Sequence, residues 1–123
     1  MTAQRILVVE DEPDARQLLT LLFQLEGYDV SAAADGRQAL DYLEQEPPPS
    51  LILLDLMMPG VSGWEVRQAQ LRNPRLADIP VIIQSGVVET AHWEADLGNA
   101  RLLAKPVEPA VLLETVREIV QKS

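Results

Sequence analysis

Leu51-Ile52-Leu53-Leu54-Asp55 is the stretch that decides the fold, because four consecutive apolar residues run directly into a carboxylate. A continuous apolar run of this length is typical of a β-strand that is buried on both faces. The loop that follows contains Pro59, Gly60 and Gly63, and it leads into a helix expected over about 64–72. The stretch therefore predicts one strand–helix unit of a parallel sheet.

The same alternation of apolar runs and helical stretches extends along the chain in both directions. Strands are expected at 6–9, 28–33, 81–83 and 101–104, in addition to 51–54. Helices are expected from Pro13 to about 25, from Asp35 to the prolines at 47–49, weakly over 89–97, and from Pro109 onward. Five strands alternating with helices specify an α/β fold whose parallel sheet is covered on both faces, and the length fits one domain, 1–123.

Composition excludes several classes of function. The net charge is −9, from 19 acidic against 10 basic residues, which argues against nucleic acid as the direct partner. The absence of cysteine excludes disulfides and zinc–thiolate sites. No apolar run approaches the roughly 18 residues of a membrane span, and the run after Met1 to Arg5 is too short for a signal peptide. We therefore expect a soluble, cytoplasmic protein with no membrane partner.

Polar residues follow the predicted strands at the point where each one ends. Four of the five strands are followed in this way, by Glu10-Asp11, Asp55, Gln84-Ser85-Gly86 and Lys105-Pro106. In an open parallel α/β sheet, ligands bind at the carboxyl ends of the strands. This edge of the sheet is therefore the predicted functional site.

The charges at this edge predict a metal site and a nucleophile. If the first and third strands are neighbours, Glu10, Asp11 and Asp55 converge on one region. Like charges about 4 Å apart repel by roughly 4 kcal/mol at an effective dielectric of about 20, so such a cluster needs a cation. Oxygen ligands without His or Cys suit Mg²⁺ or a similar ion such as Mn²⁺. Lys105 adds a second positive charge. A carboxylate beside a metal and an ammonium can attack phosphorus, because both cations neutralise the phosphoryl oxygens.

Three motifs resemble those of response-regulator receiver domains, and the similarity covers essentially the whole chain. They are ILVVEDEPD at 6–14, LILLDLMMPGVSG at 51–63 and LLAKP at 102–106. The resemblance implies a flavodoxin-like, doubly wound five-stranded sheet of order 2-1-3-4-5. It also implies a phosphorylation-dependent signalling switch of a two-component phosphorelay. Its partners would be a histidine kinase or histidine phosphotransfer protein and an unidentified downstream protein.

The resemblance also implies a role for each matching residue. Asp55 would be the phosphoacceptor and a metal ligand, Asp11 would bind Mg²⁺ directly, and Glu10 would bind it through a water. The backbone carbonyl of Met57 would complete the metal site.

Further matching residues would contact the phosphoryl group. Ser85 would donate its hydroxyl to a phosphoryl oxygen, and Gly86 would leave access to the phosphate. Lys105 would pair with the phosphoryl group, and the Lys105–Pro106 peptide would be cis. The chain would assist its own phosphorylation and dephosphorylation without being an enzyme for a separate substrate.

Departures from the family pattern keep an alternative function open. Leu102 stands where many members have an aromatic residue coupled to the position of Ser85. The segment between Ser85 and Lys105 is short, and Gly98-Asn99 lies in it where the family usually has a Gly-Ala-Asp-Asp-like turn. A receiver-like module that binds proteins independently of phosphorylation is therefore an alternative. A haloacid-dehalogenase-type phosphatase would need a second Asp at position 57, where the chain has Met.

Simpler readings of the same polar residues also remain open. The acidic residues Glu10, Asp11 and Asp14 also suit a helix start. Ser85 could cap a turn, and Lys105 could be a solvated surface lysine.

Overall fold

The computed structural model of the protein describes residues 1–123 except 1–3, 56–59, 61–62, 86–99, 106 and 123. The helix expected over 89–97 lies outside the described residues. The described elements, in chain order, are β1 (Arg5–Val9), α1 (Pro13–Leu25), β2 (Asp29–Ala33), α2 (Gly36–Gln45), β3 (Leu51–Asp55), α3 (Gly63–Arg72), β4 (Val81–Ser85), β5 (Arg101–Ala104) and α5 (Pro109–Lys122).

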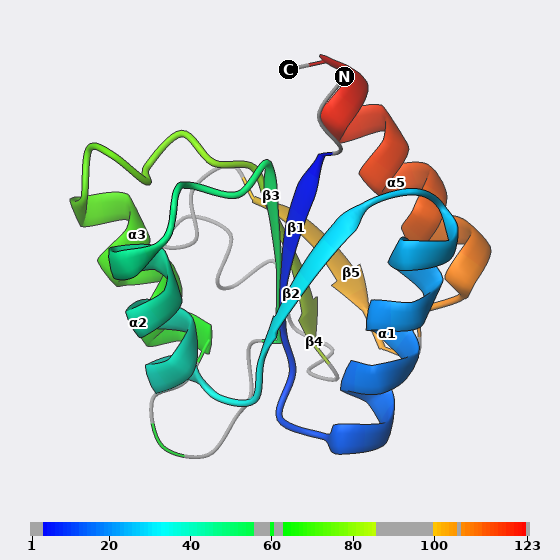
Figure 1. The fold of residues 1–123 in the computed structure, drawn as a ribbon, viewed down its shortest axis with the longest axis horizontal. Helices are drawn as coiled ribbons and strands as arrows, with labels where there is room; N and C mark the ends of the chain where they lie inside the picture. Colours follow the sequence, from blue (N-terminus) through cyan, green and yellow to red (C-terminus); the bar gives the residue numbers. More distant parts are fainter. Residues whose placement is uncertain (1–3, 56–59, 61–62, 86–99, 106, 123) are drawn as a thin grey trace.

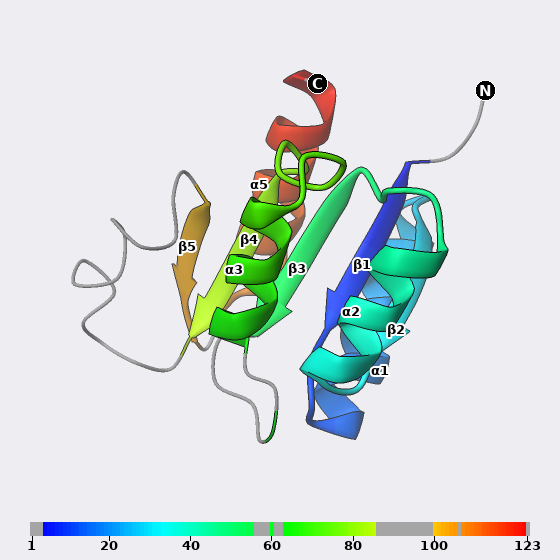
Figure 2. The same ribbon diagram turned by 90° about the vertical axis from the view of Figure 1, so that its left-hand side faces the viewer.

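The five strands form one parallel sheet of order β2-β1-β3-β4-β5, as predicted. Figure 2 shows the strands side by side, with their arrowheads at the same end of the molecule. β3 is the central strand, and its neighbour β1 pairs with it so that Val9 lies opposite Leu54 in the register. The carboxyl ends of β1, β3, β4 and β5 therefore meet at one edge, where the polar residues were expected.

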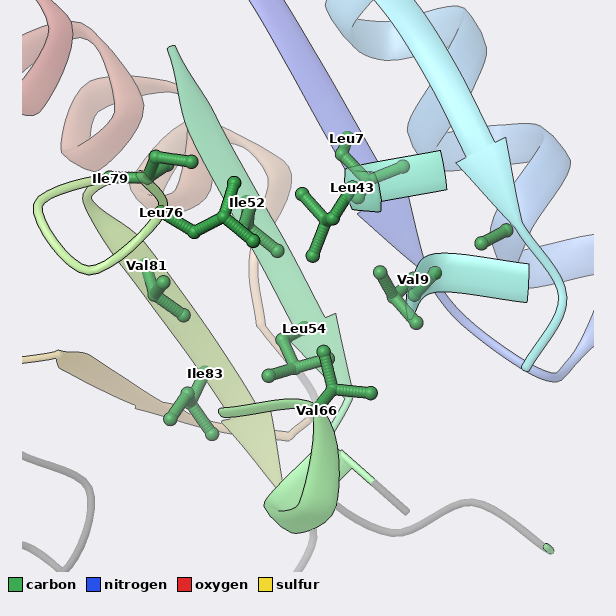
Figure 3. Close-up of a cluster of buried hydrophobic side chains, with 12 residues drawn as sticks. Leu7, Val9, Leu43, Ile52, Leu54, Val66, Leu76, Ile79, Val81 and Ile83 are labelled. Atoms are coloured by element: carbon green, nitrogen blue, oxygen red, sulfur yellow. The ribbon is translucent and has the colours of Figure 1, made fainter. Parts of the chain in front are cut away.

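The helices cover the sheet on both faces, with α1 and α5 on one side and α2 and α3 on the other (Figure 1). Alternation along each strand sends side chains to opposite faces. Leu7, Ile52 and Ile83 pack with Val66 of α3 on one face (Figure 3). Val8, Leu53 and Ile82 pack with Phe23 of α1 and Val116 of α5 on the other. The inner strands β1, β3 and β4 are buried on both faces, which explains why they read as continuous apolar runs.

The helix ends follow signals that are visible in the sequence. Pro13 stands at the start of α1, and Gly27, just beyond its end, has φ +92, a backbone conformation that costs glycine little. Asp35 caps α2 by accepting a hydrogen bond from the Gln38 N–H at 2.8 Å. None of the helices in the described part of the chain is both long and apolar enough to cross a membrane.

The observed element bounds differ from the predicted ones by one or two residues. β2 begins at Asp29 rather than at Tyr28, and α3 begins at Gly63. β3 and β4 extend to Asp55 and Ser85, because Asp55 pairs with Gln84 and Ser85 pairs with Ala104 in the ladder. The phosphoacceptor candidate is thus the last residue of a strand, not the first residue of a loop.

Candidate functional site

Three polar side chains form a row across the sheet on the face covered by α1 and α5. Asp55 on β3 and Gln84 on β4 are register partners, so their side chains leave the sheet on the same face. Glu10 directly follows Val9, the register partner of Leu54, and its N–H continues the ladder by donating to the Ala33 carbonyl at 3.1 Å. The row Glu10–Asp55–Gln84 therefore follows from strand register.

Glu10, Asp11 and Asp55 converge at the carboxyl edge of the sheet. One carboxylate oxygen of each lies within 4.8 Å of the others. Glu10 is 2% exposed and Asp55 is 3% exposed, whereas Asp11 is half-buried. Three carboxylates at this spacing form a donor set that a hard divalent cation prefers. The sequence-based expectation that these residues gather at one edge is confirmed.

Lys105 bridges two of the three carboxylates. Its Nζ lies 3.0 Å from Asp55 Oδ2 and 3.2 Å from Glu10 Oε1. The lysine follows β5, at the edge of the sheet, and spans β4 to reach β3 and β1. One ammonium therefore compensates two buried negative charges.

The pKa values of Glu10 and Lys105 reflect this arrangement. Burial raises the pKa of the Glu10 carboxyl above 4.5, and the charge of Asp55 raises it further. The Glu12 N–H and Lys105 act in the opposite direction without cancelling the rise. Burial alone lowers the pKa of Lys105, but its contacts with Asp55 and Glu10 outweigh that and raise it above 10.5. Lys105 is therefore a fixed positive charge at neutral pH.

The loop that carries Glu10 and Asp11 is held by the first turn of α1. The Glu12 N–H donates to Glu10 Oε2 at 3.2 Å, and Glu12 Oε1 accepts from the Asp14 N–H at 3.0 Å. Arg16 Nη1 donates to the carbonyls of Glu10 and Asp11 at 2.9 and 3.4 Å. These contacts fix the backbone from which the two acidic side chains project.

Several predicted site residues lie outside what the structure describes. Ser85 is the last residue of β4, two residues beyond the predicted strand end, and only its backbone is described. Met57, Gly86 and Pro106 fall outside the described residues. Their roles stay predictions.

Gln84 was recognised in the sequence as a strand-end residue but received no role. It is 4% exposed, and its Nε2 has no hydrogen-bond acceptor among the described residues. The sequence does mark Gln84 as unusual, because it is the one polar residue in the run Val81-Ile82-Ile83-Gln84. The direction of its side chain depends on strand register, which the sequence alone did not assign residue by residue.

Comparison with known proteins agrees with the resemblance carried by the three sequence motifs. The family model described as "Response regulator receiver domain" matches residues 6–117. The DNA-binding dual master transcriptional regulator RpaA of Synechocystis is 35% identical over 121 residues, which are 97% of this chain and 50% of that protein. The DNA-binding response regulator MtrA of Mycolicibacterium smegmatis is 34% identical over 93% of this chain and 49% of its own length. This chain spans about half the length of the curated relatives it matches.

A solved structure has the same architecture. The chemotaxis protein CheY4 of Vibrio cholerae superimposes with a TM-score of 0.87 at 28% identity, covering 96% of this chain and 99% of that one.

Proposed function

Since this chain belongs to the response regulator receiver domain family, we propose that it is a cytoplasmic signalling switch that takes a phosphoryl group from a partner phosphohistidine onto Asp55. The observation that carries the proposal is the buried Asp55 carboxylate, bridged by Lys105 and set within 4.8 Å of Glu10 and Asp11. The donor is a histidine kinase or a histidine phosphotransfer protein, and the phosphorylated chain acts on a downstream protein.

Phosphoryl transfer uses Asp55 as the nucleophile. A carboxylate oxygen of Asp55 forms a bond to phosphorus while the P–N bond of the phosphohistidine breaks, and the electron pair returns to the imidazole nitrogen. The Lys105 ammonium, already 3.0 Å from Asp55 Oδ2, moves onto a phosphoryl oxygen as negative charge spreads there. Ser85 donates its hydroxyl to another phosphoryl oxygen, and Gly86 leaves room for the group.

The acidic residues fit a Mg²⁺ or Mn²⁺ ion. Asp11, Asp55 and the Met57 carbonyl would hold it directly, and Glu10 would hold it through a water. When bound, the ion supplies positive charge next to the transferred group. In the absence of the ion, the Lys105 ammonium still contacts both Glu10 and Asp55.

The aspartyl phosphate acts by shifting an equilibrium between two conformations of the chain. Hydrolysis of the acyl phosphate then resets the switch. The chain assists both steps on its own Asp55, and it does not turn over a separate substrate.

Mass spectrometry of the intact chain tests the proposal. Incubation with Mg²⁺ and acetyl phosphate should add one phosphoryl group, and Asp55→Asn should abolish the addition. Asp41→Asn, on the exposed face of α2, is the matched control and should be phosphorylated normally. No mass gain in the wild type, or a gain that survives Asp55→Asn, would rule out Asp55 as the acceptor.

Leu102 favours a second candidate function. Its side chain is partly buried against the core cluster below α2 and α3, where many family members carry an aromatic switch residue. A receiver fold that binds its partner in either phosphorylation state would tolerate this residue. A partner affinity that beryllofluoride, a mimic of the phosphoryl group, leaves unchanged would support this second function.

A further inference from the structure

Gln84 is a buried polar residue that the proposed phosphoryl transfer does not use. It is the last residue but one of β4, it follows the apolar run Val81-Ile82-Ile83, and it is 4% exposed. Its amide nitrogen Nε2 has no hydrogen-bond acceptor in the part of the chain that the structure describes. Buried polar groups of folded proteins are almost always hydrogen-bonded, and an unpaired one destabilises the fold. An acceptor for this amide is therefore expected in another state of the chain.

Gln84 lies beside the phosphoacceptor and along the path of the Lys105 side chain. It is the register partner of Asp55, so the two side chains leave neighbouring strands on the same face of the sheet. Lys105 follows β5 and reaches Asp55 on β3, so its side chain crosses β4, the strand that carries Gln84. Gln84, Glu10 and Lys105 also line one pocket of ≈ 370 Å³. The amide, the carboxylate and the ammonium therefore border a common space.

In the unphosphorylated chain, the Lys105 ammonium contacts the carboxylate oxygens that lie nearest to this space. Its Nζ is 3.2 Å from Glu10 Oε1 and 3.0 Å from Asp55 Oδ2. The other oxygen of Glu10, Oε2, accepts from the Glu12 N–H at 3.2 Å. A charged ammonium is a stronger donor to a carboxylate than a neutral amide is. Lys105 therefore holds both oxygens, and the Gln84 amide is left without an acceptor among the described residues.

Phosphorylation of Asp55 would free one of these oxygens. As the phosphoryl group arrives, the Lys105 ammonium moves onto a phosphoryl oxygen and away from Glu10 Oε1. Because the Glu10 side chain is 2% exposed, water cannot readily replace the lost donor. The Gln84 amide can turn toward this oxygen, since the terminal torsion of a glutamine is soft and the pocket leaves space for it.

We propose that Gln84 is a positioning residue, whose amide donates to Glu10 Oε1 when Lys105 turns to the phosphoryl group. The exchange keeps the buried Glu10 carboxylate hydrogen-bonded and thereby stabilises the phosphorylated chain. The inference rests on the proposed function, because it is a phosphoryl group on Asp55 that draws the ammonium away from Glu10. Gln84 acts through Glu10 and Lys105 and takes no part in the transfer itself.

Gln84→Met should have opposite effects on the two states of the chain, because it keeps the length of the side chain and removes the amide. In metal-free buffer it should raise the urea midpoint of unfolding, since an unpaired buried donor is gone. With Mg²⁺ and beryllofluoride it should weaken beryllofluoride binding at least about fivefold, since Glu10 then lacks its new donor. Fluorine NMR of the free and bound beryllofluoride measures the dissociation constant.

Three further variants make the test specific. Gln24→Met removes an exposed amide from α1 and should change neither property. Glu10→Gln removes the charge of the proposed acceptor, so Gln84→Met should weaken beryllofluoride binding less in this background than in wild type. Gln84→Leu, which matches the apolar residues before it in β4, should repeat both effects of Gln84→Met and serves if the methionine variant does not fold.

The possible results separate the inference from the proposed function. A wild type that binds no beryllofluoride in the presence of Mg²⁺ would overturn the proposed function itself. Four other results would overturn only the inference. They are a urea midpoint that does not rise, or a chain that does not fold, in both Gln84 variants; an unchanged beryllofluoride affinity in them; the same changes in Gln24→Met; and an equal loss of affinity in the wild-type and Glu10→Gln backgrounds.

Discussion

The Lys105 ammonium forms ion pairs with two buried carboxylates, so replacing this lysine should destabilise the protein. Breaking one buried ion pair costs about 3–5 kcal/mol. The Lys105 side chain is 34% exposed, so we expect a smaller loss for Lys105→Met, of about 1–2 kcal/mol in the free energy of unfolding. Urea unfolding in metal-free buffer measures it.

An exposed ion pair on α2 provides the control for Lys105. Arg37 and Asp41 are 3.6 Å apart with side chains 75% and 48% exposed, so Arg37→Met should cost under about 0.5 kcal/mol. The loss from Lys105→Met should also shrink in an Asp55→Asn background, where one of the two charges is already gone. If Lys105→Met and Arg37→Met lowered the free energy of unfolding equally, the bridging role of Lys105 would be contradicted.

Glu10 makes the stability of the metal-free protein depend on pH. Because its pKa is raised in the folded state, its contribution is fully present below its unfolded pKa of 4.5 and is lost as pH rises through the folded value. Glu10→Gln removes this loss. We expect the stability of the variant relative to wild type to increase as pH rises above 4.5. Thermal unfolding in EDTA at several pH values checks it, and a constant difference would refute the assignment.

At the residue scale, the sequence identified the charged groups of the site but not their partners. Glu10, Asp11, Asp55 and Lys105 were predicted from their places after the strands, and the structure brings them together. Two features depend on strand register and on how far side chains reach across the strands. One is that Lys105 contacts both Glu10 and Asp55, and the other is that Gln84 is buried with no acceptor among the described residues. Sequence spacing contains no information on either.

The start of α2 is fixed by hydrogen bonds of the Asp35 and Gln38 side chains, and Asp35 was predicted from the sequence as the cap. Asp35 Oδ1 accepts from the Gln38 N–H at 2.8 Å, and Gln38 Oε1 accepts from the Ala34 N–H at 2.8 Å. Asp35→Ala should therefore lower the free energy of unfolding by about 1 kcal/mol. Asp41→Ala, which removes only an exposed pair on the same helix, should cost about 0.3–0.5 kcal/mol. Comparable urea midpoints for the two variants would mean that the cap contributes little.

At the element scale, prediction worked because the sheet is buried on both faces. Continuous apolar runs marked β1, β3 and β4, and proline or a capping residue marked the helix starts. The errors were at the ends: Asp55 and Ser85 are polar and were placed outside their strands, although the ladder includes both. A polar residue that ends a strand at a ligand site is missed by any rule that reads strands from apolar runs.

Metal binding should stabilise the whole molecule through the acidic cluster. Mg²⁺ at about 100 times its dissociation constant should raise the free energy of unfolding by about 2.7 kcal/mol. Asp11→Asn should remove most of this gain and, in EDTA, should leave the chain at least as stable as wild type, since one of three neighbouring charges is gone. Asp14→Asn, an exposed acid in the first turn of α1, is the control and should keep the full response. Equal responses in a melting titration would show that the ion binds elsewhere.

At the scale of the molecule, the strand order and the two-sided packing were predicted correctly. The alternation of strands and helices gave the parallel sheet, and the order β2-β1-β3-β4-β5 came from the family resemblance. Periodicity alone cannot order strands, because every arrangement of five buried strands shows the same apolar pattern.

The Lys105 bridge joins residues 95 positions apart in one contact and 50 apart in the other. A nascent chain that has not yet emerged beyond β5 carries Asp55 but lacks the ammonium, and a chain that has lost β1 lacks the first acidic group. Neither fragment contains all the charged groups that the Lys105 contacts bring together. The complete site is therefore assembled only when segments from both halves of the chain are present and folded together.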